Sequence, residues 1–174
     1  MKFGIYSRYL VDDVMPIGKK SILIRVFSDN NDYFDMKYIN LYSNVLNLCI
    51  KDFCEKKEDE LEQLRVKFVE LNNFILSNDF DEVIVHCALG ISRSPAIMIC
   101  IAKILGSLDM ENIIKENFRF YNKIIVDEFV KFDYLRKNIS IDNVIFEGYN
   151  KDTDYRSFDI IDNKNDTYSL VLKR

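Results

Sequence analysis

The chain has 174 residues, of which 48% are apolar and 30% charged, the length and composition of one globular domain with a buried core. A net charge of -4 and a pI near 5.1 exclude a protein that coats nucleic acid or an anionic membrane through its overall charge. A local anion site stays compatible with these numbers, because it needs only a few cations.

Neither a membrane span nor a secretory signal is expected. The longest apolar stretch, 95–105, contains Lys103 and is far shorter than the roughly 20 residues that a span requires. Residues 1–6 lack the apolar region and cleavage site of a signal peptide. We therefore expect a cytoplasmic protein whose four cysteines are thiols. They are Cys49, Cys54, Cys87 and Cys100.

The first half of the chain predicts strands separated by turns and one long helix. Strands are expected at 2–6, 21–27 and 44–50, and residues 58–76 show a helical spacing of apolar positions. Residues 81–87 contain three consecutive β-branched side chains, which is typical of a strand buried inside a parallel sheet.

The second half predicts three helices and then short strands. Helices are expected at 96–105, where Gly106 ends the helix, and at 110–118 and 124–137. This alternation predicts an α/β fold with a central, largely parallel sheet flanked by helices. Strands at 144–146, 157–161 and 168–172, with a turn at 162–166, indicate a small β-rich C-terminal extension. We divide the chain into a domain of residues 1–140 and this extension, 141–174, which either stands apart or packs on the same domain.

Residues 85–95 combine the end of a strand, a short loop and the start of a helix. In α/β folds, ligands bind beside the carboxyl ends of the strands, and a helix N-terminus favours an anion. Gly90 lets the backbone curl, Arg93 can grip phosphate oxygens with two nitrogens, and Ser92 or Ser94 can cap the helix. A thiol beside a helix N-terminus and an arginine loses its proton readily. Cys87 is therefore expected to be a nucleophile that attacks a bound phosphate ester.

The segment from His86 to Ser94 resembles the H-C-x-x-G-x-x-R-[ST] signature of protein tyrosine phosphatases. Its Gly-Ile-Ser-Arg-Ser-Pro portion is most similar to the dual-specificity branch and its small bacterial and viral relatives. The resemblance covers about residues 1–140, but only this loop is specific. It implies that Cys87 attacks phosphorus, that Ser94 assists breakdown of a phosphocysteine intermediate, and that no metal or other cofactor is needed. The phosphate-binding residues it implies are Ala88, Leu89, Gly90, Ile91, Ser92 and Arg93.

The resemblance also implies an aspartic acid that protonates the leaving oxygen. Asp52 is our choice, because it follows an apolar strand and lies about 35 residues before Cys87. Asp59 is the alternative. Asn122 is a further candidate, as a residue that orients water.

Three neighbouring features have a structural interpretation beside the functional one. His86 precedes Cys87 on a strand, so the two side chains point to opposite faces; we expect the imidazole to hydrogen-bond loop backbone as a supporting residue. Leu89 is large for its position and is expected either at the pocket mouth or packed beneath it. Cys49 or Cys54 could form a reversible disulfide with Cys87, although simple packing is the favoured interpretation.

The sequence therefore predicts an enzyme that removes phosphate from phosphotyrosine, and also from phosphoserine or phosphothreonine, in a protein or peptide partner. One alternative is a pseudophosphatase that binds phosphorylated partners without turnover. Others are a phosphatase for phosphoinositides, inositol phosphates or RNA 5′-triphosphates, or a sulfurtransferase, whose loop usually has a different Cys-to-cation spacing. The sequence leaves the oligomeric state open.

Overall fold

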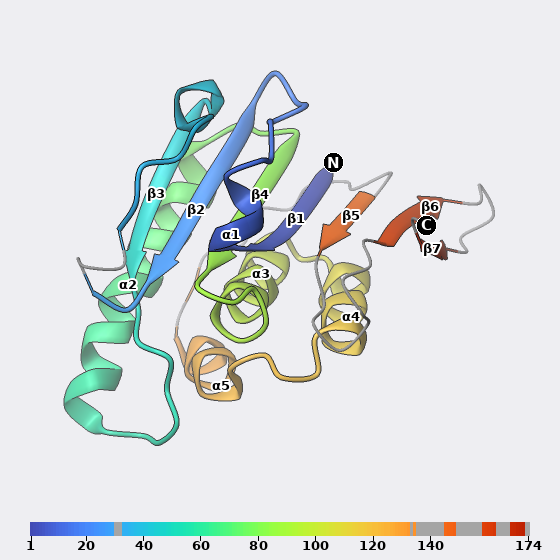
Figure 1. Cartoon of the computed structure of the whole chain (residues 1–174). Coiled ribbons are helices and arrows are strands. Elements are labelled where there is room, and N and C mark those ends of the chain that lie inside the picture. Colours follow the sequence, from blue (N-terminus) through green and yellow to red (C-terminus); the bar gives the residue numbers. More distant parts are fainter. Residues whose placement is uncertain (30–32, 133, 135–144, 149–157, 163–167, 173–174) are drawn as a thin grey trace.

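Strands and helices alternate along the chain (Figure 1). The computed structural model describes residues 1–29, 33–132, 134, 145–148, 158–162 and 168–172. The strands of the main sheet are β1 (Lys2–Ser7), β2 (Ser21–Phe27), β3 (Asn44–Cys49), β4 (Glu82–Cys87) and β5 (Ile145–Gly148). The helices are α1 (Arg8–Val11), the 3-10 helix η2 (Ile39–Leu41), α2 (Glu58–Ser77), α3 (Arg93–Ile104), α4 (Leu108–Asn117) and α5 (Lys123–Lys131).

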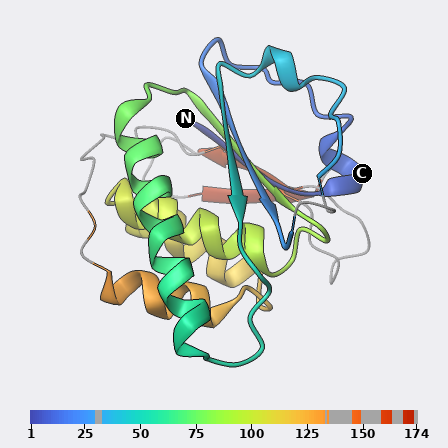
Figure 2. The same ribbon diagram turned by 90° about the vertical axis from the view of Figure 1, so that its left-hand side faces the viewer.

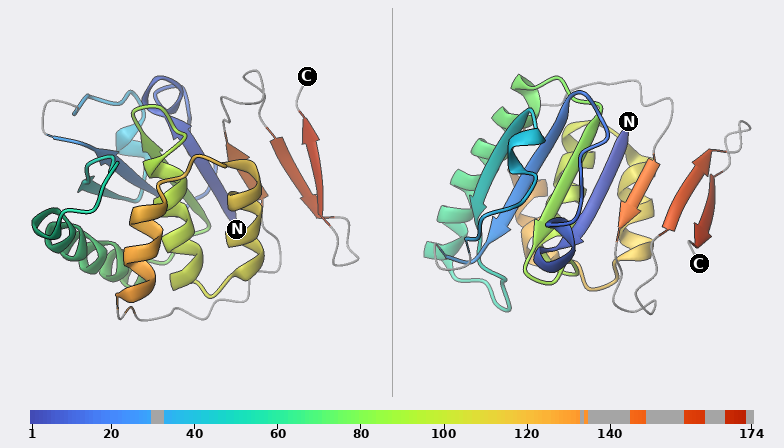
Figure 3. Two further views of the ribbon diagram at one scale, coloured as in Figure 1. Left: turned by 90° about the horizontal axis from the view of Figure 1, so that it is seen from below. Right: turned by 45° about the horizontal axis from the view of Figure 1, so that its top comes forward.

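The main sheet is parallel throughout, with the strand order β3-β2-β4-β1-β5. The right-hand view of Figure 3 shows this order, with β4 in the centre of the sheet. Cys87 is in register with Ser7, and Phe27 is in register with Cys49. The carboxyl ends of four strands therefore meet at one edge of the sheet. The predicted α/β class with a largely parallel sheet flanked by helices is confirmed.

The two faces of the sheet are covered differently (Figure 2). Helices α2, α3, α4 and α5 cover one face, and their apolar side chains form the main core with alternate residues of the strands. The opposite face is covered by α1 and by the segment that contains η2. A smaller cluster lies there, made by Val11, Leu23, Met36, Tyr42 and Ile84.

Helix α3 is the central element of the helical layer. Eleven of its residues are buried, among them Ala96, Ile99 and Cys100, because it contacts α4 and α5 as well as β4 and β1. Gly106 follows the helix with a positive φ of 70°. A residue without a Cβ adopts that backbone conformation readily, so α3 ends where the sequence predicts.

Helix α5 is shorter than predicted. The expected helix ran over 124–137, but α5 ends at Lys131, and Phe132 has an extended backbone with ψ of 134°. The reason is packing: the Phe132 ring lies 5.9 Å from that of Phe68 and 6.1 Å from that of Phe129. The chain leaves the helix so that another aromatic ring can reach the core. Residues 133 and 135–137 of the prediction lie outside the described residues.

The C-terminal strands occur close to the predicted positions. β5 pairs with β1 as the edge of the main sheet, whereas β6 (Phe158–Asp162) and β7 (Tyr168–Leu172) form an antiparallel pair of their own (Figure 3). Residues 163–166 of the predicted turn lie outside the described residues, and the division of the chain at residue 140 stays a prediction. Within the described part, no helix has the length and apolarity needed to cross a membrane.

Candidate active site

The loop 88–92 connects the carboxyl end of β4 to the start of α3 and rests against the end of β1. Gly90 has a φ of 78°, and a Cβ at this position would lie only 2.7 Å from the backbone nitrogen of Ser7. The Arg8 amide also donates to the carbonyl oxygen of Ala88 at 3.3 Å. Both the conformation and the close approach require glycine at position 90. The end of β1 therefore holds the loop in its curled shape.

The backbone amides of the loop are available to an anion. The Gly90 N–H donates to the Cys87 sulfur at 3.2 Å. The amides of Ala88, Leu89, Ile91 and Ser92 donate to no acceptor among the described residues. Successive unpaired amides at the start of a helix form an anion-binding site, to which the helix dipole adds.

Ser94 contacts the sulfur of Cys87 from the first turn of α3. Its Oγ lies 3.2 Å from the Cys87 Sγ, and both side chains are buried. The hydroxyl can donate to a sulfur that carries negative charge, as the sequence predicts for Ser94. The prediction that Ser92 or Ser94 caps α3 is wrong: Ser92 occupies the N-cap position but makes no side-chain cap bond. The Ser94 hydroxyl is directed to the sulfur, and that of Ser92 to Asp52.

The guanidinium of Arg93 is anchored through one nitrogen, while the edge formed by its other two nitrogens can still bind a ligand. Its Nη1 donates to the Ser28 Oγ at 2.7 Å and to the Ile50 carbonyl at 3.2 Å. Its Nε and Nη2 have no hydrogen-bond partner among the described residues, although the side chain is 94% buried. These two donors form the planar fork that binds two oxygens of a phosphate. The anchoring contacts orient the fork before any ligand arrives.

Asp52 lies beside this guanidinium, on the loop after β3. Its Oδ1 accepts hydrogen bonds from the Ser92 hydroxyl at 2.6 Å and from the Asn122 Nδ2 at 2.8 Å. Its Oδ2 is 3.9 Å from the Arg93 Nε, and the side chain is about half exposed. The predicted acid is thus brought to the loop, within reach of a substrate and of water. The alternative acid, Asp59, belongs to the first turn of α2 and has no contact with these groups.

Asn122 holds the Asp52 loop in place. Besides Asp52, its Nδ2 donates to the carbonyl of Phe53 at 3.0 Å, and its backbone N–H donates to the carbonyl of Ser92 at 3.0 Å. Its Oδ1 accepts from the Ile125 N–H and so caps α5. The structure therefore gives this buried residue a positioning contact with the acid, where the sequence suggested contact with water.

His86 is buried on the face of β4 opposite to the helical layer and does not contact the sulfur. Neither ring nitrogen makes a hydrogen bond of good geometry with the described residues, yet the Cys87 backbone influences the pKa of the ring, so the predicted hydrogen bond to loop backbone stays a prediction. The ring packs edge-on against Phe34, with 5.5 Å between centroids. Burial, with the charges of Arg25 and Arg8, lowers the pKa of His86 to about 3, although the Cys87 backbone opposes this shift. The imidazole is therefore neutral at physiological pH.

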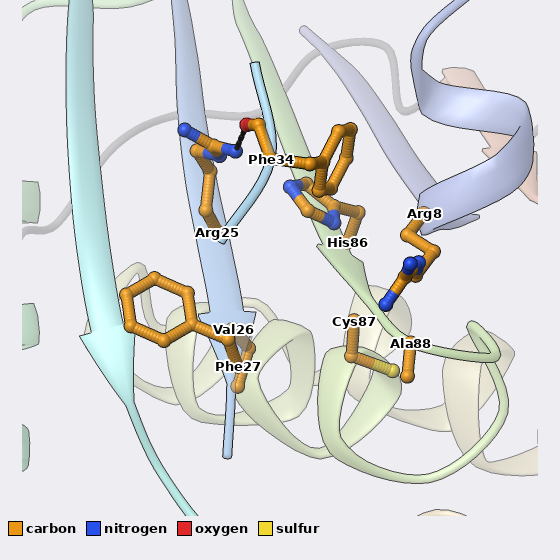
Figure 4. A pocket seen from close by; sticks show the side chains of 8 residues that line it. All are labelled: Arg8, Arg25, Val26, Phe27, Phe34, His86, Cys87 and Ala88. Atoms are coloured by element: carbon orange, nitrogen blue, oxygen red, sulfur yellow. Dashed lines mark hydrogen bonds between the residues drawn. The ribbon is translucent and has the colours of Figure 1, made fainter. Parts of the chain in front are cut away.

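A small open pocket of about 10 Å³ lies beside the loop (Figure 4). It is lined by Arg8, Arg25, Val26, Phe27, Phe34, His86, Cys87 and Ala88. Sequence reasoning missed Arg25, Arg8 and Phe34 in this pocket, and Ser28 beside Arg93. Only Arg25 carried a signal, because it is the single charged residue of the strand 21–27 and is flanked by apolar residues at 22–24 and 26–27.

Leu89 and the outer cysteines lie at the surface near the site. Leu89 is 51% exposed, which favours the pocket mouth over packing beneath the loop. Cys49 and Cys54 are exposed free thiols, whereas Cys87 and Cys100 are buried free thiols. A reversible disulfide of Cys87 with one of the exposed cysteines stays a prediction.

No protein-family model matches the chain, and the curated proteins contain no match to its sequence. The geometry of the loop and the short resemblance of residues 86–94 are therefore the basis on which a function can be assigned.

Proposed function

We propose that the protein is a cysteine-dependent phosphatase of the dual-specificity type, which hydrolyses phosphotyrosine and also phosphoserine or phosphothreonine in a protein partner. The observation that carries this proposal is the convergence of three chain segments. The loop 87–93 supplies a thiol, unpaired amides and the open edge of Arg93. The loop after β3 supplies Asp52, and the start of α5 supplies Asn122, which holds it.

In the first proposed step, the Cys87 thiolate attacks phosphorus in line with the leaving oxygen. A sulfur–phosphorus bond forms as the ester phosphorus–oxygen bond breaks, and the Asp52 carboxyl gives its proton to the leaving oxygen. The loop amides and the Arg93 fork are placed to stabilise the equatorial oxygens in the transition state.

In the second step, water attacks the phosphocysteine and inorganic phosphate leaves. Asp52 now accepts a proton from the water, and the sulfur departs as a thiolate. Ser94, whose Oγ is 3.2 Å from the Cys87 Sγ, can donate a hydrogen bond to the developing charge on sulfur. The cycle returns the enzyme to its starting state without any other reactant.

The surroundings of Cys87 support an aryl phosphate as substrate. Phe27 and Phe34 line the adjoining pocket, and Leu89 is exposed on the loop itself. Aromatic and aliphatic walls beside a phosphate site suit the ring of phosphotyrosine. A phosphorylated protein in the cytoplasm is thus the partner that we propose.

The test is hydrolysis of p-nitrophenyl phosphate and of a phosphotyrosyl peptide by the purified chain. We expect turnover of both, inhibition by vanadate and no loss of activity with a metal chelator. A chain that binds the phosphopeptide but releases no phosphate would be a binding module, and a chain that does neither would contradict the proposal altogether.

A further inference from the structure

Glu128 is a buried carboxylate that contacts three cations. It lies on α5, and its side chain is 2% exposed. Its Oε1 is 3.3 Å from the Lys56 Nζ and 2.6 Å from the Lys131 Nζ, and its Oε2 is 3.5 Å from a terminal nitrogen of Arg65. The hydrogen bond from Lys131 lowers the pKa of Glu128, burial opposes this shift, and the hydrogen bond from Lys56 adds to it. The carboxylate is therefore ionised at physiological pH.

Only one of these cations can join Glu128 to the segment that carries Asp52. Lys131 is on the same helix, three residues further on, and Arg65 is on α2. Their contacts thus lie within α5 or join α2 to α5, two helices that pack together and cross in Figure 2. Lys56 belongs instead to the connection between β3 and α2.

This connection, residues 50–57, is called the acid loop here and is attached to α5 at two points. At the start of the helix, the Asn122 Nδ2 donates to Asp52 and to the carbonyl of the following residue. The second point is the contact of Lys56 with Glu128, six residues further along the chain. Six residues are about 9 Å of helix, and the three loop residues that follow the first point span up to about 10 Å. The acid loop therefore runs along α5 between the two points.

The second attachment is expected to decide how Asp52 is oriented. Residues 54–57 make no other hydrogen bond or ion pair with described residues outside the acid loop and α2. A loop held by Asn122 alone could pivot about that contact, and a reacting group displaced by about 1 Å can lose much of its effect. Glu128 opposes such a pivot because α5 is fixed in the core: the next residue, Phe129, is fully buried and packs edge-on against an aromatic ring of α2.

We propose that Glu128 is a positioning residue for the proposed general acid: its ion pair with Lys56 holds the acid loop against α5 and thereby places Asp52 at the candidate active site. Glu128 acts only through Lys56 and touches no reacting atom. The inference rests on the phosphatase function proposed above. It distinguishes the contact with Lys56 from the other two contacts of Glu128, which hold the helices and leave the acid loop unchanged.

The test compares kcat on a phosphotyrosyl peptide and on p-nitrophenyl phosphate in the Lys56→Met variant. We expect about a fivefold fall on the peptide, the size expected for the loss of an ion pair with one half-exposed partner. The fall on p-nitrophenyl phosphate should be less than about twofold, because its leaving group needs little protonation. Lys56→Arg should retain the rate, since it keeps a cation that can reach Glu128. Lys131→Met is the matched control: it removes a cation from the same carboxylate oxygen but not from the acid loop, and should change neither rate.

A double-mutant cycle separates the ion pair from the rest of the cluster. Glu128→Gln alone should lower the peptide rate by a similar factor. Adding Lys56→Met to it should lower the rate little further, because both substitutions break the same contact. Folding is checked by circular dichroism and Tm. If Glu128→Gln does not fold, Lys56→Met and Lys56→Arg carry the test, because Lys56 is 47% exposed.

An unchanged peptide rate in Lys56→Met would overturn the proposal. Equal falls on the two substrates would do so too, as would a fall in Lys131→Met as large as that in Lys56→Met. Hydrogen exchange gives a readout that needs no turnover: amides 51–57 should exchange faster in Lys56→Met than in the unsubstituted chain or in Lys131→Met, and unchanged exchange would contradict the attachment. Absence of turnover by the unsubstituted chain would contradict the phosphatase function, whereas exchange still tests the attachment, so that the two failures are distinguished.

Discussion

The phosphate loop and the Arg25 pocket share the Cys87 wall but treat their polar side chains in opposite ways. In the loop, Ser94 contacts the sulfur, Asp52 accepts two hydrogen bonds, and Arg93 is anchored by one nitrogen. In the pocket, Arg25 and His86 are more deeply buried than Asp52 and leave four nitrogens without partners. The polar side chains of the loop are oriented by contacts with one another, whereas those of the pocket keep donors and acceptors without partners among the described residues.

This difference has an energetic meaning. A buried donor without a partner costs about 1–3 kcal/mol, so the pocket lowers the stability of the empty fold. The oriented loop instead lowers the reorganisation needed at the moment of reaction. The two regions should therefore respond differently to substitution: changes in the loop should reduce the proposed catalysis, and changes in the pocket should alter stability.

The largest effect is expected for Cys87→Ser. It removes the nucleophile, and we expect the rate of p-nitrophenyl phosphate hydrolysis to fall at least about a thousandfold while phosphopeptide binding persists. A steady-state assay with calorimetry on the same preparation checks both parts. Retained turnover would show that the chemistry takes place elsewhere.

Arg93→Lys is expected to have the next largest effect, because it keeps the charge but loses the planar fork and the anchoring contacts with Ser28 and Ile50. We predict a fall in kcat/KM of about 10²–10³, as for the loss of a preorganised donor. The matched control is Arg65→Lys on α2, which pairs with Glu58 of the same helix and with Glu128 of α5. Similar losses in both variants would contradict a specific role for the fork.

Asp52→Asn should lower kcat on a phosphotyrosyl peptide by about a hundredfold, the usual size of a general-acid contribution. The loss should be clearly smaller for p-nitrophenyl phosphate, whose leaving group needs little protonation. Asp59→Asn serves as the control and should change neither rate. Equal losses on the two substrates would show that Asp52 orients the loop and does not donate a proton.

Asn122→Ser separates positioning of the acid from folding. A serine keeps an oxygen that can cap α5 but loses the amide that donates to Asp52 and Phe53. We predict about a tenfold fall in kcat with little change in Tm, since only oriented contact with the acid is lost. Asn122→Ala should lose the cap as well and so lower Tm. An unchanged kcat in Asn122→Ser would contradict a role of Asn122 in positioning Asp52.

The smallest effect concerns pH and the pocket. The pKa of His86 is about 3 in the folded chain and near 6.5 in an unfolded one, so between these values the unfolded state binds the additional proton. Its contribution to stability is complete above pH 6.5 and is lost as the pH falls toward 3. In this window, His86→Gln should remove up to about one proton from the difference in bound protons between the unfolded and the folded state. The slope of the unfolding free energy against pH should therefore become shallower. His86 is the only histidine, so the slope that remains comes from carboxylates. Identical slopes in both proteins would contradict a buried, neutral imidazole.

The sequence was most informative where one local pattern determined the structure. Three β-branched residues in 81–87 predicted the central strand, and the spacing from Cys87 to Arg93 predicted the loop, because strand, turn and helix start are all encoded within eleven residues. Asp52 was chosen through its offset from Cys87, and the structure places it beside Ser92 and Arg93, while its role as the acid stays a prediction. The partners Ser28 and Asn122 were not found in these roles, because contacts across 65 and 70 residues depend on the folded topology.

Other predictions failed because side chains pack into the core or make hydrogen bonds with other partners than those expected. The helix expected to reach residue 137 ends at Lys131, because Phe132 turns into the core and tertiary contact overrides helical periodicity. The serines expected to cap α3 are engaged by Cys87 and Asp52 instead. Arg25 was visible as a charge among the apolar residues of β2, but the pocket that it lines with Arg8 and Phe34 depends on the folded topology.

The most direct test of the central claim is a search for a phosphoryl group on the Cys87 sulfur. The Asp52→Asn variant is mixed with p-nitrophenyl phosphate, quenched in acid and digested, and the peptide that contains Cys87 is examined by mass spectrometry. We predict phosphate bound to Cys87 in near-stoichiometric amount and none in the Cys87→Ser, Asp52→Asn double variant. Release of phosphate by the active chain with no phosphocysteine detectable at any quench time would contradict the account.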